Sequence, residues 1–167
     1  MGKEMPRNYF LQIAVAFVLS MAVTVSAIAE DKQEDIYLHY LKDVSGFAFG
    51  PENQDSFTVA TPHGIFSVAQ ENGLVQKINS YTGYLIELIA RPDKANVMFT
   101  SGYKSKEEKL GVLKSEDGGK TWSKVSDGAN APVAFYAMAI SANDPKVLYG
   151  ADENIQVSHD GGHTWTI

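Results

Sequence analysis

Two histidines near the C-terminus, His159 and His163, lie four positions apart and could reach one metal ion. A metal site needs further ligands, and the sequence marks none beside them. The chain has no cysteine and no Gly-x-Ser-x-Gly motif, so no activated nucleophile is indicated either. We therefore predict no metal site and no cofactor, and the sequence identifies no catalytic residue.

Carboxylates are the other side chains that could do chemistry. Glycosidases use two of them, facing each other across a cleft. Residues 30–167 contain nineteen Asp and Glu residues, so many pairs can be imagined and none is distinctive. Two of these acids, Asp117 and Asp160, recur within nearly identical octamers, SEDGGKTW (115–122) and SHDGGHTW (158–165). Glycoside hydrolysis stays open as an alternative function.

The residue types of the octamers suit a turn between two strands. Serine and aspartate side chains can bond neighbouring backbone N–H groups, and the glycines can adopt positive φ. The threonine restarts a strand, and the tryptophan offers a large apolar face to bury. We therefore predict structural roles for Ser115, Asp117, Gly119, Thr121, Trp122, Ser158, Asp160, Gly162, Thr164 and Trp165.

The octamers belong to a longer repeat. Two units, 84–125 and 134–167, follow the same plan, and 44–78 is a less regular first copy. A period of 40–50 residues is typical of propeller or solenoid units. Each unit contains short runs of alternating apolar or β-branched residues, separated by clusters of Pro, Asn, Asp and Gly. The chain after residue 30 is therefore expected to be all-β, with about four strands in each unit.

The pattern Ser-x-Asp-x-Gly-x-Thr-Trp in both octamers is similar to the Asp-box, also called the BNR repeat. This repeat occurs in sialidases, sortilin-type receptors, xyloglucanases and the photosystem II assembly factor family. The units also resemble small secreted bacterial Asp-box proteins that are labelled glycosyl hydrolase-like. The resemblance covers roughly residues 44–167 and implies a partial β-propeller of about three four-stranded antiparallel blades. It implies no activity, because the same fold hosts many functions.

Two departures from these families bear on function. Sialidases clamp a substrate carboxylate with three arginines, whereas residues 30–167 contain Arg91 alone, which argues against sialidase activity. Three units are also too few to close a ring, because propellers have four or more blades. Either the chain is the front part of a longer propeller, or an open arc is completed by self-association or by a partner.

The N-terminal segment has the features of a signal peptide. Lys3 and Arg7 precede an apolar run over 9–25, and small residues follow it before position 30. An uncleaved membrane anchor is the alternative, because about 20 apolar residues can span a bilayer. Both interpretations place the folded part outside the cytoplasm, in the periplasm or secreted. Residues 1–29 are the predicted signal peptide, and 30–43 a linker or leading strand.

The charge of the remaining chain limits its partners. Residues 30–167 carry a net charge of −7, from twelve Lys and Arg against nineteen Asp and Glu. An acidic surface makes nucleic acid an unsuitable partner. A chain without cysteine must also rely on its hydrophobic core. The partner expected on these grounds is a protein or a glycan, with membrane contact only through an uncleaved N-terminal segment.

The order of strands in a blade predicts where binding residues would lie. The octamers share one face with the loops between first and second strands. The opposite face carries the loops between second and third strands and the connections between units. Binding residues concentrate on loops held by a rigid scaffold. The candidates on that face are His63, Tyr81, Tyr103, Lys104, Asp127 and Asp152. The sequence thus predicts an exported, non-catalytic binding or assembly module.

Overall fold

The computed structural model describes residues 36–49, 55–81 and 83–167. They belong to one compact unit, Asp35–Ile167. The predicted signal peptide and residues 30–35 of the predicted linker lie outside the described residues. Within these ranges the chain is all-β apart from one short 3-10 turn, η1 (Leu38–Tyr40). None of the described residues belongs to a helix that is long and apolar enough to cross a membrane.

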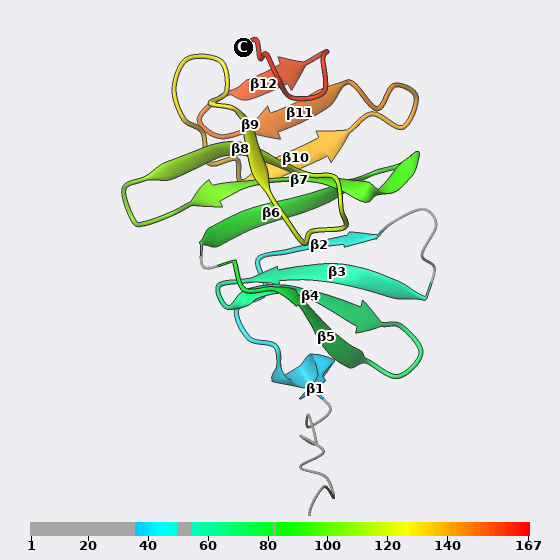
Figure 1. Cartoon of the computed structure of the whole chain (residues 1–167). Helices are drawn as coiled ribbons and strands as arrows, with labels where there is room; N and C mark the ends of the chain where they lie inside the picture. Colours follow the sequence, from blue (N-terminus) through cyan, green and yellow to red (C-terminus); the bar gives the residue numbers. More distant parts are fainter. Residues whose placement is uncertain (1–35, 50–54, 82) are drawn as a thin grey trace, which may run out of the picture. The chain divides into compact units, whose positions relative to one another are not determined.

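The strands form three antiparallel sheets that follow one another along the chain (Figure 1). We call the sheets blades 1, 2 and 3. The strands of blade 1 are β1 (Ile36–Tyr37), β2 (Gly46–Phe49), β3 (Ser56–Thr61), β4 (Gly64–Ala69) and β5 (Leu74–Asn79). Those of blade 2 are β6 (Tyr84–Arg91), β7 (Lys94–Tyr103), β8 (Lys109–Ser115) and β9 (Ser123–Ser126). Those of blade 3 are β10 (Ala137–Ile140), β11 (Leu148–Ala151) and β12 (Ile155–Ser158).

The predicted fold class is confirmed as all-β and as part of a β-propeller, although the strand counts differ at both ends. Blade 1 gains a fifth strand because β1 pairs with the outer strand β5. Blade 3 has three strands, and its fourth is reduced to a bridge in which Val157 and Thr166 exchange two backbone hydrogen bonds of 2.8 and 2.9 Å.

The register of the strands gives the three blades a common plan. Phe57, Met98 and Leu148 hold equivalent positions in β3, β7 and β11. Met98 pairs with Ser115 and Leu148 with Ser158, so each octamer begins at the same point of its blade. In blade 1 the residue at this point is Val68, which pairs with Phe57. Blade 1 therefore has the same plan without an octamer.

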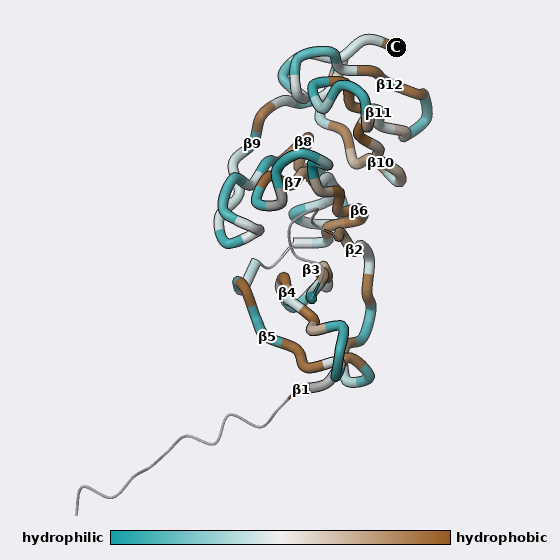
Figure 2. Tube along the Cα trace, turned by 90° about the vertical axis from the view of Figure 1, so that its right-hand side faces the viewer, coloured by the Kyte–Doolittle hydropathy of each residue, from teal (hydrophilic) through white to brown (hydrophobic). Residues whose placement is uncertain are grey.

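Two hydrophobic cores fill the spaces between the blades. Residues of blades 1 and 2 form the first core, which contains Ala48, Ala60, Ile65, Leu85, Leu88, Met98 and Leu113. Residues of blade 2 and of the chain from 133 onwards form the second, which contains Val97, Phe99, Val112, Val133, Phe135, Met138, Leu148 and Trp165. Hydrophobic stretches of the strands alternate with hydrophilic turns (Figure 2). The blades are therefore joined by burial of apolar side chains from facing sheets.

Successive residues of one strand point to opposite faces of the sheet. In β7, Phe99 belongs to the core shared with blade 3, and Met98 to the core shared with blade 1. We call the side of a blade that packs on the next blade its forward face and the other side its backward face. The backward face of blade 1 has a smaller core of its own, formed by Val59, Phe66, Val68 and Val75 with Leu41 and Phe57 against it.

Candidate functional site

The two octamers form hydrogen-bonded turns of the same kind. In the first, Ser115 Oγ donates to Asp117 Oδ1 at 2.8 Å and accepts the N–H of Gly119 at 2.8 Å. Asp117 also accepts the N–H and the hydroxyl of Thr121, at 2.9 and 2.6 Å. Gly119 has a φ of 88°, which an L side chain rarely adopts. The serine, the aspartate and the threonine are therefore needed for these hydrogen bonds, and the glycine for this backbone angle.

The second octamer repeats these contacts. Ser158 Oγ donates to Asp160 Oδ1 at 2.9 Å and accepts the N–H of Gly162 at 2.9 Å. Asp160 accepts the N–H and the hydroxyl of Thr164 at 2.9 and 2.6 Å, and also the N–H of His163 at 3.0 Å. Both oxygens of the carboxylate are therefore already occupied by the turn.

These contacts hold both carboxylates in the ionised form. The hydrogen bond from the Thr121 hydroxyl, followed by the bond from its N–H, lowers the pKa of Asp117 to about 2. The hydroxyl of Thr164 lowers the pKa of Asp160 in the same way. A carboxylate that stays ionised at neutral pH cannot act there as a general acid.

Acid is expected to loosen the turns, because both carboxylates have a lower pKa in the folded chain than the ordinary value of about 3.9. The stability that they contribute is present above about pH 4 and is lost as the pH falls toward the folded pKa of Asp117, about 2. Thermal unfolding followed by circular dichroism should show the midpoint falling over this window. The chain with Asp117→Asn and Asp160→Asn should show a flatter profile, and an equal fall in both chains would contradict the assignment.

Each octamer is also bonded to the blade that precedes it. The carbonyl of Gly119 accepts the amide of Asn79, at the end of β5, at 2.5 Å, and the indole N–H of Trp122 at 3.0 Å. The carbonyl of Gly162 accepts the hydroxyl of Ser126, at the end of β9, at 2.6 Å. Asn79 and Ser126 occupy equivalent positions, opposite Ile65 and Val112. The octamers therefore connect consecutive blades.

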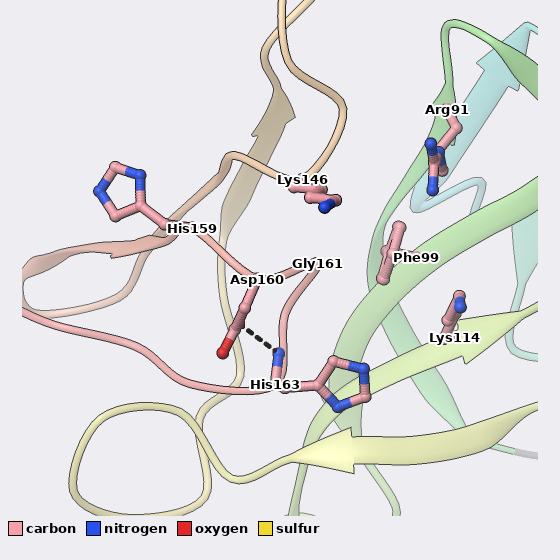
Figure 3. A pocket seen from close by; sticks show the side chains of 8 residues that line it. All are labelled: Arg91, Phe99, Lys114, Lys146, His159, Asp160, Gly161 and His163. Atoms are coloured by element: carbon pink, nitrogen blue, oxygen red, sulfur yellow. Dashed lines mark hydrogen bonds between the residues drawn. The ribbon is translucent and has the colours of Figure 1, made fainter.

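A cleft of about 310 Å³ lies beside the second octamer (Figure 3). Its lining residues are Arg91, Phe99, Lys114, Lys146, His159, Asp160, Gly161 and His163. Two of the cations are neutralised, because Arg91 forms a bidentate pair with Asp93 at 2.7 and 2.8 Å and Lys114 contacts Glu116 at 2.6 Å. Asp160 is the single carboxylate in this lining, and the turn already uses it.

The structure does not bring the rings of the two histidines together as ligands of one metal ion. Figure 3 shows the rings of His159 and His163 on different sides of the Asp160 backbone. In the part of the chain that the structure describes, no three His, Asp or Glu side chains come together as metal ligands.

A second cavity, of about 540 Å³, lies at the turn between β7 and β8. Its lining consists of Tyr84, Tyr103, Lys104, Ser105 and Lys106. Tyr84 and Tyr103 are paired across β6 and β7, so both rings project from the same face of the sheet. Tyr84 is 61% exposed. The loop that carries the lysines is closed by a hydrogen bond from the Lys104 N–H to the Glu108 carbonyl, at 2.8 Å.

The structure brings together two of the six predicted binding residues, Tyr103 and Lys104. The turns between β3 and β4, β7 and β8, and β11 and β12 lie on the left of Figure 1, and the octamers on the right. The other four candidates do not line this cavity.

These four residues make local contacts. The N–H of His63 donates to the Thr61 hydroxyl at 3.0 Å, and its side chain is exposed. Tyr81 packs against the core between blades 1 and 2, and burial raises its pKa. Asp127 pairs with Lys124, and Asp152 accepts the Asn154 N–H at 3.1 Å. Their participation in binding stays a prediction.

Sequence reasoning missed Tyr84, Ser105 and Lys106. Tyr84 begins a strand, and a single sequence does not show which residue will face it across the sheet. The available signal was the long loop 102–111, which only blade 2 has. Pairing that loop with the tyrosine at the start of the preceding strand would have indicated the cavity.

Comparisons with known proteins show similarity in fold. No family model matches the sequence, and no curated protein matches it. An ancestral GH74 enzyme is similar in structure, with a TM-score of 0.56 and 20% identity over 73% of this chain. A GH74 enzyme from Niastella koreensis gives 0.51 and 17% over 74%, and a GH74 xyloglucanase from Xanthomonas campestris 0.52 and 16% over 74%. The chain covers only 18%, 22% and 23% of these three chains.

Proposed function

We propose that this chain is an exported, non-catalytic glycan-binding module built on propeller blades, whose octamers are Asp-box turns. The observation that supports it most directly is the cavity between β7 and β8, where two tyrosine rings stand side by side next to two lysines. The site combines a concave shape, aromatic surface and a few polar donors, which is the usual composition of a small-ligand site.

The chemistry of the lining favours a sugar. The apolar C–H face of a pyranose ring packs on an aromatic ring, and the phenol hydroxyls remain free to bond sugar hydroxyls. Lys106 adds an ammonium donor for hydroxyl or carboxylate oxygens, whereas the Lys104 ammonium pairs with Glu108 Oε1 at 3.2 Å. A cavity of about 540 Å³ has the size of a site for a small ligand, so an oligosaccharide would place one or two rings in it.

The similarity to solved structures supports a glycan over a protein partner by analogy. The three solved structures named above are GH74 enzymes, and one is named as a xyloglucanase. An exported location would place the module where cell-wall and extracellular glycans occur.

The alternative function is glycoside hydrolysis by this chain as part of a longer propeller, which the fold similarity to GH74 enzymes favours. Hydrolysis needs two carboxylates across the scissile bond. The cavity of Tyr84 and Tyr103 is lined by none, and the octamer cleft only by Asp160, which the turn uses. Release of reducing ends from xyloglucan by the purified chain would favour the alternative over binding alone.

Replacing both tyrosines of the cavity with alanine is expected to weaken glycan binding at least tenfold, because each ring supplies a stacking surface. Titration calorimetry with a xyloglucan oligosaccharide and with an oligogalacturonate would measure it and would separate neutral from acidic ligands. Tyr136→Ala is the matched control, since Tyr136 is 59% exposed and lies outside both cavities. The proposal is wrong if neither saccharide binds the unaltered chain, or if the control weakens binding equally.

A further inference from the structure

The forward face of blade 3 is exposed, whereas the forward faces of blades 1 and 2 are buried against the next blade. On the forward face of blade 2, Phe99 and Val112 are 1% and 0% exposed beneath blade 3. Strand register makes Tyr149 the equivalent of Phe99, because each follows the residue paired with the octamer serine. Ile155 is the equivalent of Val112, since each lies three residues before that serine. Tyr149 is 43% exposed and Ile155 69%.

Blade 1 is open on the opposite side. Leu88 pairs with Thr100 in blade 2, and it is 1% exposed against blade 1. The equivalent residue of blade 1 is Phe47, which pairs with Val59 and is 60% exposed. Phe49, two residues further along β2, is 57% exposed and meets Phe47 edge to face, with ring centroids 6.1 Å apart.

The two open faces are complementary. Each established joint in the chain consists of a forward face packed on the backward face of the next blade. One copy therefore carries an unpaired forward face on blade 3 and an unpaired backward face along β2 of blade 1. Exposed apolar surface of this kind marks an interaction site, and a second copy of the same chain offers the matching face. Hydrophobic stretches run along β10, β11 and β12 (Figure 2).

We propose that two copies of this chain associate head to tail, with the forward face of blade 3 in each copy packed on β2 of blade 1 in the other. Two such contacts would cover both open faces of each copy at once. The joint between copies lacks an octamer, because Val68 stands where blades 2 and 3 have the octamer serine. The association therefore depends on apolar packing alone and is reversible with dilution.

The test uses the chain exported from cells that express all 167 residues, with its mass measured by light scattering over a range of concentrations. The unaltered chain should reach twice the monomer mass as concentration rises. Ile155→Lys and Phe47→Lys each place a charge in both joints and should leave monomers. Mixing these two variants restores one intact joint, so the mixture should recover dimers.

Tyr84→Lys is the matched control, because Tyr84 is similarly exposed but lies in the cavity of blade 2 and should leave the dimer intact. Equal thermal midpoints at a dilution where every variant is monomeric would show that the substitutions leave the fold unchanged. A monomer at every concentration up to about 1 mM would overturn the proposal. A dimer that only Ile155→Lys disrupts would also overturn it, because the contact would then be between identical faces. Variants that fail to associate when mixed would overturn it for the same reason.

Discussion

Replacing Trp165 with alanine is expected to lower the free energy of unfolding by about 3–5 kcal/mol. The ring is only 6% exposed and lies 5.1 Å, centroid to centroid, from Phe135 in the core between blades 2 and 3. Its indole N–H also donates to the Gly162 carbonyl and to the Ser126 hydroxyl, at 3.0 Å each. A domain is stable by only about 5–15 kcal/mol, so urea denaturation should detect this loss without ambiguity.

Trp165→Phe separates the two contributions of the tryptophan. It keeps most of the apolar volume and removes the N–H, so we expect a loss of about 1–2 kcal/mol. The Gly162 carbonyl keeps the Ser126 hydroxyl as a donor at 2.6 Å, which limits the cost. If phenylalanine and alanine proved equally destabilising, the hydrogen bonds and not the packing would dominate.

Gly150→Ala is expected to destabilise the chain by about 1–3 kcal/mol through overpacking. A Cβ atom at this position would lie within 2.6 Å of three atoms of the Phe135 ring. The ring cannot move aside easily, because Phe135 is 0% exposed. The effect comes from a close approach of strand β11 to the ring, and thermal or urea unfolding would measure it.

A second substitution tests this cause. In the Gly150→Ala background, Phe135→Leu removes atoms from the crowded side and should cost less than it does in the unaltered chain. The difference is the coupling free energy of a double-mutant cycle, which is about 0.5–3 kcal/mol for residues in contact. Strictly additive losses would show that the added methyl group is accommodated elsewhere.

Much of the fold could be predicted from the sequence because two periodicities coincide in it. Alternating apolar residues indicate strands, and the repeat of 40–50 residues divides the strands into units. The octamers then align the units, as the pairing of Met98 with Ser115 and of Leu148 with Ser158 shows. The first strand, Ile36–Tyr37, lies in the segment 30–43 that was predicted only as a linker or leading strand, because two residues are too few to show alternation.

The candidate site was harder to predict from the sequence than the fold, because it depends on which residues pair between strands. Tyr103 and Lys104 could be chosen from a long loop, but Tyr84 joins them only through the register of β6 and β7. Tyr81 has the residue type of a binding residue, yet it packs against the core between blades 1 and 2. Loop position alone does not distinguish an aromatic side chain that faces solvent from one that fills a gap between sheets.

The bonds between octamers and blades have a direction along the chain. Asn79 precedes the octamer whose Gly119 carbonyl it binds, and Ser126 precedes the octamer of Gly162. Every partner that an octamer requires has therefore left the ribosome before the octamer itself. Each octamer can therefore close onto the preceding blade as soon as it has itself been made.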